Sequence, residues 1–282
     1  MELIFLGTGA GNGVPVFYCG CKVCREAEAN PKCRRTRCAV LAMGDGNNLF
    51  DAPPEISSQL LREKIEAVDR LFLTHAHHDH TAGLGDLAIY VRFFRGGTLP
   101  AFMSKETLVE LEGRYGDVRD WLNVELMEPG QSIHTGGMEV TALAVSHSTG
   151  TLGFLLRCDG PLTAYIPDTG PLPQATKRSL AGIDRLILDG TFSEENWYPE
   201  EHLTISQAIA TARELNVGKL FLTHLSMHYS KPVTCKELEE AFENFDEKVG
   251  LAYDGLRLNL SESQMRRGWS EKSLEDRVLP AG

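Results

Sequence analysis

The side chains best suited to bind metal ions are concentrated in one short segment, His75-Ala76-His77-His78-Asp79-His80. Neutral histidine is the commonest side-chain ligand of metal ions, because one ring nitrogen is free to bind a cation. His75 and His77 stand two residues apart, so in an extended backbone they point to the same side. Asp79 and His80 follow the turn, where they could hold a second ion. This HxHxDH pattern predicts a two-metal loop, and a surface loop that is merely rich in histidine is the alternative.

Three further candidate ligands lie where predicted strands end: His147, Asp168 and His224. A single histidine in such a place is more often an ordinary residue, but together with the HxHxDH loop these side chains predict one site. Ligands at strand ends of an α/β sandwich converge on one edge of the sheets. The segment 219–224 nearly repeats the segment 70–75, which predicts two related halves that each deliver a histidine at a strand end.

The composition is that of an ordinary globular protein, since 42% of the 282 residues are hydrophobic and 24% are charged. No apolar run is long enough to span a bilayer and no leader is visible, so we expect a cytoplasmic protein without a membrane anchor. The net charge of −11 opposes binding to long nucleic acids. Seven cysteines, five of them between residues 19 and 38, argue against a disulfide framework in a chain without an export signal, and they point to metal.

The HxHxDH motif with further ligands from later strands resembles the metallo-β-lactamase-fold hydrolases. The resemblance implies an α/β (α+β) fold with four layers, αββα, and a small cysteine-rich zinc-binding insertion. The implied ligands of the first metal are His75, His77 and His147. Those of the second metal are Asp79, His80 and His224, and Asp168 would bridge the two. Asp51 resembles the family's aspartate that orients a metal-bound histidine, with capping of a helix as its alternative role.

The resemblance covers residues 1 to about 260, which we expect to form the hydrolase domain, with residues 261–282 as an amphipathic C-terminal helix or a tail. Turn and periodicity signals place secondary structure within this domain. The predicted hairpin spans residues 39–50, and the predicted helices span residues 55–66, 84–94, 105–115 and 204–215.

Cys19, Cys21 and Cys24 form a CxCxxC element, a good partial shell for a structural zinc ion, which usually takes four nitrogen or sulfur ligands. In the resembling cyclic phosphodiesterases the fourth ligand is a histidine three residues beyond the last active-site histidine. Here that position is Met227, and His228 is one residue further on. The candidates for the fourth ligand are His228, Cys33 and Cys38, and free buried thiols are the alternative to a zinc site.

The CxCxxC element, the following Arg-Arg-Thr-Arg segment and the late LTHxS motif narrow the resemblance to the PhnP-type phosphodiesterases of phosphonate metabolism, in the carbon–phosphorus lyase pathway. It implies hydrolysis of 5-phospho-α-D-ribose 1,2-cyclic phosphate to ribose 1,5-bisphosphate by a hydroxide that bridges the two metals. Manganese is the usual catalytic metal of that family, zinc also suits these ligands, and zinc fills the cysteine site. The expected partner is a small phosphorylated sugar or a nucleotide-like substrate. We expect no binding to membranes or to long nucleic acids, and a homodimer is the assembly to test.

His202 corresponds to a region in which the family has a catalytic histidine, so it is the candidate for protonating the leaving oxygen. The alternative is that His202 only precedes the following helix and has no role in the reaction. Arg34, Arg35 and Arg37 form a basic cluster that could grip the distant phosphate of the substrate, or could be solvated surface.

Three rival functions share much of this pattern. A tRNA 3′-processing endonuclease of the same superfamily would have nearly the same metal ligands, but it needs a broad basic surface that this chain lacks. The branch related to pyrroloquinoline quinone synthesis also carries a cysteine zinc site. A non-catalytic protein that binds metal or ligand is the third rival, although a purely structural metal site would be closed.

Overall fold

The computed structural model describes residues 1–229, 231–243 and 248–261 of the chain. The predicted C-terminal helix or tail therefore lies outside the described residues, apart from residue 261. Within the described ranges, no helix combines the length and the apolar character that a membrane crossing requires.

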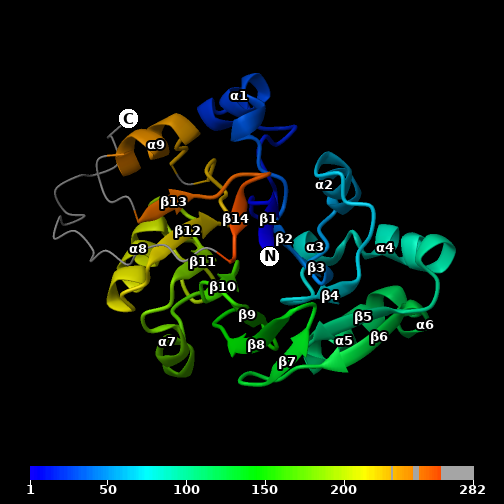
Figure 1. Ribbon diagram of the computed structural model, residues 1–282. Helices are drawn as coiled ribbons and strands as arrows, with labels where there is room; N and C mark the ends of the chain where they lie inside the picture. The colour runs from blue at the N-terminus through cyan, green and yellow to red at the C-terminus, as the bar shows by residue number, and fades with distance from the viewer. Residues whose placement is uncertain (230, 244–247, 262–282) are drawn as a thin grey trace.

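Two seven-stranded sheets form the middle of the molecule (Figure 1). The first sheet has the order β14 (Arg257–Asn259), β1 (Glu2–Gly7), β2 (Ala39–Gly44), β3 (Gly46–Phe50), β4 (Arg70–Phe72), β5 (Leu99–Met103) and β6 (Leu122–Leu126). The second has the order β13 (Val249–Leu251), β12 (Lys219–Thr223), β11 (Arg185–Asp189), β10 (Thr163–Ile166), β9 (Leu152–Arg157), β8 (Met138–Ala144) and β7 (Ser132–Thr135).

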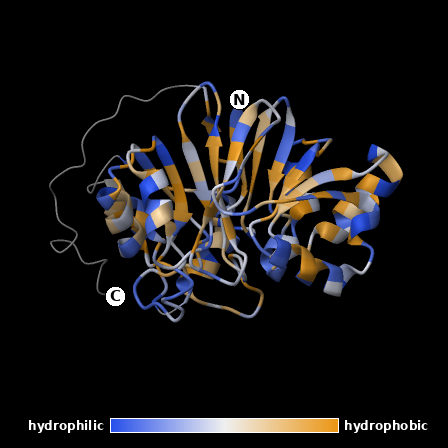
Figure 2. Ribbon diagram, turned by 90° about the horizontal axis from the view of Figure 1, so that it is seen from below, coloured by the Kyte–Doolittle hydropathy of each residue, from blue (hydrophilic) through white to orange (hydrophobic). Residues whose placement is uncertain are grey.

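Helices cover the outer face of each sheet, which completes four layers (Figures 1 and 2). The helices packed on the first sheet are α2 (Ile56–Arg62), α4 (Leu84–Tyr90), α5 (Lys105–Tyr115) and α6 (Val118–Trp121). Those packed on the second are α1 (Lys22–Ala29), α7 (Gln174–Leu180), α8 (Ile205–Glu214) and α9 (Cys235–Glu243). The short elements are η1 (Pro31–Cys33), α3 (His78–Thr81) and η2 (Val91–Arg95). The predicted αββα fold is confirmed.

The strands explain the layers, because successive side chains of a strand point to opposite faces. In β1, Phe5 packs between the sheets, whereas its neighbours Ile4 and Leu6 face the helices. In β12 the same division separates Phe221 from Leu220 and Leu222. Strands buried on both faces must be largely apolar, which is why the central strands β1, β2, β11 and β12 read as nearly continuous hydrophobic runs.

Several predicted elements appear where the sequence placed them. The hairpin is formed by β2 and β3, with Gly44 opposite Gly46. Helix α5 begins after Ser104, whose Oγ accepts a hydrogen bond from the Thr107 amide at 3.1 Å. Helix α8 begins with a capping box between Thr204 and Gln207.

The arrangement of parallel strands decides where the candidate ligands lie. Strands β3 to β6 run parallel in the first sheet, and β10 to β13 run parallel in the second. The near-repeated segments form β4 and β12, one in each sheet, and each strand is followed by a histidine, His75 and His224. The carboxyl ends of both sets of strands therefore lead to the same site.

Candidate metal centre

The structure brings all seven predicted metal ligands into one cluster. Three of them, His75, His77 and His147, form one group, and their ring centroids lie 4.4 to 4.9 Å apart. The Nε2 of His147 lies 3.2 Å from the Nδ1 of His77. Burial, with the nearby charge of His80, lowers the pKa of His75 well below its usual range, so His75 is in the neutral form that can bind a cation.

The second group consists of Asp79, His80 and His224, and it lies directly beside the first. The Oδ2 of Asp79 is 3.5 Å from the Nε2 of His80 and 3.4 Å from the Nε2 of His224. The ring centroid of His80 lies 4.4 Å from that of His75, so the two groups share a border.

Asp168 lies at that border. Its Oδ2 is 3.0 Å from the Nε2 of His80, and its Oδ1 is 3.1 Å from the Nε2 of His224. Ligand atoms of His75, His80 and Asp168 also lie within 4.8 Å of one another. Asp168 therefore contacts the second group through His80 and His224 and approaches the first group through His75, which is the position that a bridging ligand requires.

In several of these histidines, the ring nitrogen that faces away from the cluster has a hydrogen-bond partner. The Nδ1 of His80 donates to the Oδ2 of Asp51 at 2.9 Å. The Nδ1 of His147 donates to the carbonyl oxygen of Glu201 at 3.0 Å, and that of His224 lies 2.8 Å from the Oγ1 of Thr191. Such partners fix each ring's orientation and leave Nε2 for a cation.

Asp51 is buried and is held in turn by Thr74. The amide of Thr74 donates to its Oδ1 at 2.9 Å, and the Thr74 hydroxyl donates to both carboxylate oxygens. The alternative role of Asp51 as a helix cap is not observed, because Glu55 occupies the N-cap of α2. The backbone φ of Asp51 is 65°, an uncommon conformation for a residue with a side chain.

His202 lies against the cluster, and its ring centroid is 5.3 Å from that of His224 and 5.0 Å from that of His147. Its Nδ1 donates to the Oδ2 of Asp189 at 2.8 Å, which leaves Nε2 as the nitrogen available to a ligand. Burial disfavours the charged ring, but the Asp189 carboxylate outweighs burial and raises the pKa of His202 to about 9.

Asp189 was given no role from the sequence, although it ends strand β11 as the other candidates end theirs. Its Oδ1 accepts from the Thr191 amide at 2.8 Å, and its Oδ2 accepts from the Thr169 amide at 3.1 Å. Asp189 therefore ties the turn after Asp168 to His202. Its position at a strand end was the signal that could have found it.

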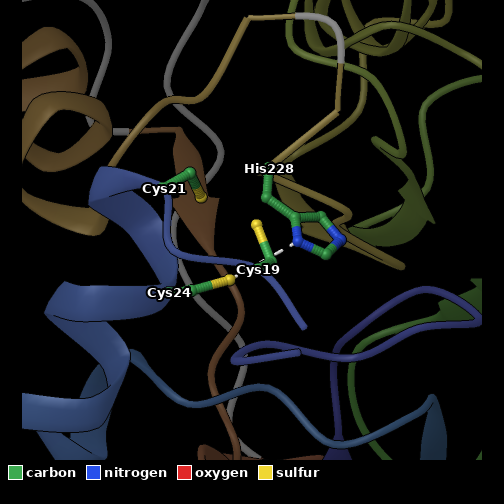
Figure 3. Close-up of side chains that lie close together, drawn as sticks. All are labelled: Cys19, Cys21, Cys24 and His228. Carbon is green, nitrogen blue, oxygen red and sulfur yellow. Dashed lines mark hydrogen bonds between the residues drawn. The ribbon is translucent and has the colours of Figure 1, made fainter. Parts of the chain in front are cut away.

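The three cysteines of the CxCxxC element lie together with His228 (Figure 3). The Sγ of Cys24 is 3.5 Å from the Nδ1 of His228. Met227, at the position where the resembling family has its histidine, is turned inward, and its Sδ accepts a hydrogen bond from the Nε of Arg35 at 2.9 Å. Among the three candidates for a fourth ligand, the structure thus places His228 at the cysteines.

The other two candidates lie elsewhere. Cys33 is grouped with Glu26 and Cys235, and Cys38 lies 3.3 Å from the hydroxyl of Thr223. Cys33 and Cys38 as fourth ligands were therefore wrong, because each side chain is buried among other partners.

Comparison with known proteins assigns the family. Residues 47–225 match the model of the β-lactamase superfamily domain. The chain belongs to this superfamily. This member is 28% identical to an octanoyltransferase of Porphyromonas gingivalis over 94% of its own length, and it spans 53% of that protein. It is 26% identical to the coenzyme PQQ synthesis protein B of Methylorubrum populi over 92% of its own length and 100% of the relative.

Solved structures agree on the fold of this superfamily member. A diphosphatase from the PhnP family superposes with a TM-score of 0.78 at 27% identity, covering 92% of this chain and 97% of that one. Zinc-bound PqqB from Methylobacterium extorquens has a TM-score of 0.76 at 22% identity, covering 92% of this chain and all of that one. At that identity the second likeness concerns the fold alone. The chain has the metallo-β-lactamase fold.

The superfamily implies divalent metal ions, and the residues of this chain fit them. Among the described residues, the Nε2 atoms of His75 and His80 and the Oδ2 of Asp168 are buried without a hydrogen-bond partner. His80 and Asp168 approach to 3.0 Å without hydrogen-bond geometry, as expected of two ligands aimed at a common third atom. A donor set of imidazoles and carboxylates suits zinc and manganese alike.

The arginine cluster does not lie at the centre as one unit. Arg35 is buried, and its guanidinium contacts Met227, Thr8, Ala252 and Cys235. Arg34 donates to the carbonyl oxygens of Ala27 and Glu28. The expectation that Arg35 binds substrate was wrong, because its guanidinium is buried among these contacts. Arg34 is exposed, and a role for it in binding substrate stays a prediction.

Arg37 differs from its two neighbours. It pairs with Glu55, and its Nε donates to the Gly11 carbonyl at 2.9 Å. Gly11 lies against the metal centre, because a Cβ on it would be 3.2 Å from the Oδ2 of Asp79. The glycine-rich loop thus brings Arg37 next to the centre, where it stays a candidate for binding a substrate phosphate.

Proposed function

We propose that this chain is a dinuclear-metal phosphodiesterase that hydrolyses a small phosphodiester, with 5-phospho-α-D-ribose 1,2-cyclic phosphate as the first substrate to test. The observation that carries the proposal is the position of Asp168, which lies beside His80 and His224 of the second group and has a ligand atom within 4.8 Å of that of His75 in the first group. The structural likeness to a PhnP-family diphosphatase supports phosphate chemistry at this centre.

Each residue of the centre then has a definite task. His75, His77 and His147 would hold one cation, Asp79, His80 and His224 would hold the other, and Asp168 would contact both. When bound, two such cations polarise a phosphoryl oxygen and lower the pKa of a water molecule toward neutrality. Arg37 is placed to hold a remote phosphate of the substrate through its charge.

His202 would complete the reaction by donating a proton. A water oxygen forms a new bond to phosphorus and gives up one proton to solvent. The ester bond to the ribose 2-oxygen breaks, and that oxygen leaves as a hydroxyl with the proton from the Nε2 of His202. Asp189 holds the opposite nitrogen, so the ring keeps its orientation during the transfer. The product is a phosphomonoester, ribose 1,5-bisphosphate.

The experiment that tests this proposal follows the phosphorus atom. Purified protein supplied with Mn²⁺, and in parallel with Zn²⁺, is incubated with the ribosyl cyclic phosphate while ³¹P NMR is recorded. We expect the cyclic phosphodiester signal to be replaced by that of a phosphomonoester, faster with Mn²⁺. A signal that persists with both metals, while bis-p-nitrophenyl phosphate is hydrolysed, would exclude this substrate. A failure with every phosphodiester would exclude the proposed activity.

Asp51→Asn is expected to weaken metal binding about 10- to 100-fold, as removal of an outer hydrogen-bond partner of a metal ligand typically does. The amide can no longer act as a charged acceptor for the Nδ1 of His80. The measurement is titration of the metal-free protein with Mn²⁺ in competition with a chelating dye. The matched control is Asp69→Asn, whose carboxylate accepts from the Asn47 amide at 2.7 Å in a turn of the first sheet. Equal affinities in Asp51→Asn and wild type would contradict the assigned role.

We also propose that Cys19, Cys21, Cys24 and His228 hold a structural zinc ion. Cys24→Ser is then expected to remove one zinc per chain and to lower the free energy of unfolding by about 4–5 kcal/mol or more, because loss of a bound metal is one of the few causes of effects of that size. Thermal unfolding and metal analysis measure the two effects together. Cys158→Ser, at a half-buried thiol outside the cluster, is the control. An unchanged zinc content in Cys24→Ser would remove this assignment.

A further inference from the structure

Two buried cysteines that neither proposed metal site uses lie against each other, Cys33 in η1 and Cys235 at the first residue of α9. Their sulfur atoms are within 4.8 Å of each other and share a hydrogen bond. The two residues are only 6% and 3% exposed. Buried thiols are ordinarily inert, so the pair can do chemistry only if its surroundings make one of the two sulfurs reactive.

A buried arginine favours an anionic sulfur at Cys235. The Nη2 of Arg35 donates to the Sγ of Cys235 at 3.5 Å, and Arg35 is itself only 2% exposed. The other recorded acceptors of this guanidinium are the Met227 sulfur, the Thr8 hydroxyl and the Ala252 carbonyl oxygen, which are all neutral. Within the described part of the chain, the Cys235 thiol is therefore the only recorded partner of Arg35 that can take the opposite charge, and a buried cation without a counter-charge is costly.

The other sulfur of the pair keeps its proton. Burial, together with the charge and the hydrogen bond of Cys235, raises the pKa of the Cys33 thiol to about 12. The Glu26 carboxylate belongs to the same group of side chains and also opposes a negative charge on Cys33. The pair is therefore suited to hold one thiolate, at Cys235 beside Arg35, in contact with one thiol, at Cys33. A thiolate is the form in which a cysteine reacts as a nucleophile.

The two segments that carry the sulfurs are fixed to each other through helices α1 and α9, which lie side by side (Figure 1). The Glu26 carboxylate of α1 accepts a hydrogen bond from the Cys235 amide at 2.8 Å. Lys22, at the start of α1, pairs with Glu237 of α9 at 2.6 Å. Because η1 follows α1 almost directly in the chain, these contacts also hold Cys33 next to Cys235.

The side chains of Glu26, Cys33 and Cys235 lie close enough together to be considered as a further metal site. Both oxygens of Glu26, however, already accept hydrogen bonds from backbone amides at the start of α9, those of Cys235 and Lys236. The Arg35 guanidinium, 3.5 Å from one of the two sulfurs, would also repel a divalent cation. The pair is therefore better suited to a reaction between its two sulfurs than to binding a metal ion.

We propose that Cys33 and Cys235 form a redox-active dithiol, a modification site that hydrogen peroxide converts into a disulfide. The oxidant has to be small, because so little of either side chain is exposed, and hydrogen peroxide is scarcely larger than a water molecule. Neither cysteine belongs to the two-metal centre or to the cluster of three cysteines with His228. This inference therefore goes beyond the proposed phosphodiesterase function and does not depend on it.

Oxidation of the pair proceeds in two steps. The Cys235 thiolate attacks one oxygen of the peroxide, the O–O bond breaks and hydroxide leaves, so that Cys235 becomes a sulfenic acid. The Cys33 sulfur then forms a bond to the Cys235 sulfur while the S–O bond breaks, and the departing hydroxyl group leaves as water with the proton of the Cys33 thiol. The sulfur pair loses the electron pair that the peroxide gains. A dithiol reductant reverses the reaction by thiol–disulfide exchange.

The test maps disulfides in the metal-loaded wild-type protein after treatment with increasing concentrations of hydrogen peroxide. The protein is unfolded in iodoacetamide, digested without reduction and measured by mass spectrometry. We expect the peptides of Cys33 and Cys235 to be joined, and to separate again with dithiothreitol. Cys38, fully buried beside the Thr223 hydroxyl, is the internal control and should stay a thiol. The inference is overturned if Cys33 and Cys235 are recovered as thiols when the half-buried Cys158 is oxidised, or if either forms a disulfide with another cysteine.

Two single variants test which sulfur reacts first, and circular dichroism checks that both are folded. In Cys33→Ala, Arg35 still lies beside Cys235, so peroxide should still consume this thiol, as sulfenic and then as sulfinic acid. In Cys235→Ala, peroxide should consume the protonated Cys33 thiol at least about tenfold more slowly than it consumes Cys235 in the other variant. Equal rates in the two variants, or faster loss of Cys33, would overturn the assignment of Cys235 as the reacting thiolate.

Discussion

Replacing Asp168 by alanine is expected to lower phosphodiester turnover at least about 1,000-fold, because two metal ions contribute several kcal/mol to such a reaction and each 1.36 kcal/mol is a factor of ten. Asp168 approaches both groups of ligands, the second through His80 and His224 and the first through His75. Its loss leaves the two groups of ligands with no shared carboxylate between them. The remaining ligands would then bind fewer ions and hold them apart.

Steady-state kinetics on the ribosyl cyclic phosphate and on bis-p-nitrophenyl phosphate would measure this loss, and both substrates should be affected alike. Asp86→Ala, which removes an exposed carboxylate from α4, is the matched control and should behave as wild type. Circular dichroism of Asp168→Ala checks that the chain is folded. A folded Asp168→Ala protein with turnover within tenfold of wild type would contradict the bridging position.

The second large effect is expected for His202→Ala. Loss of a general acid typically lowers the rate about 10²- to 10⁴-fold, and the loss should fall on kcat while the bound metal is retained. The reason is geometric, because His202 is fixed by Asp189 behind the cluster and none of the seven proposed ligands is changed.

The leaving group provides a sharp control for this second prediction. The ribose oxygen departs as a strongly basic alkoxide unless it receives a proton, whereas p-nitrophenolate departs without one. His202→Ala should therefore lose much more activity on the ribosyl cyclic phosphate than on bis-p-nitrophenyl phosphate. Equal losses on the two substrates would assign His202 to positioning the metal centre instead, and full activity on both would remove it from the reaction.

Local patterns were sufficient for much of the fold. Helix α5 occupies the predicted residues 105–115 because Ser104 caps its first turn, and the hairpin of β2 and β3 follows from the turn between them. The ligand candidates were found because their types are unusual at strand ends, and parallel strands bring such ends together. The near-repeat of 70–75 and 219–224 indicated one such strand in each sheet.

The residues that were missed or misassigned depend on contacts between distant parts of the chain. Arginine is usually found at the protein surface. Arg35 is instead buried by contacts with Met227 and Cys235, which lie about 200 positions away in the sequence. Asp189 and Thr191 hold His202 and His224 through hydrogen bonds that exist only after the sheets have assembled. Asp189 could have been suspected from its place at a strand end, but nothing in the local sequence indicates the contacts of Arg35 or Thr191.

The central claim is that seven side chains of this fold hold two divalent cations next to each other, and counting the ions tests it directly. Wild type and Cys24→Ser, reconstituted with Mn²⁺ and Zn²⁺ and dialysed, would be measured by inductively coupled plasma mass spectrometry. We expect three ions per chain in the wild type and two in Cys24→Ser, with fewer than two at the centre once Asp168 is also replaced. A Cys24→Ser protein that retains one ion or none would contradict the account.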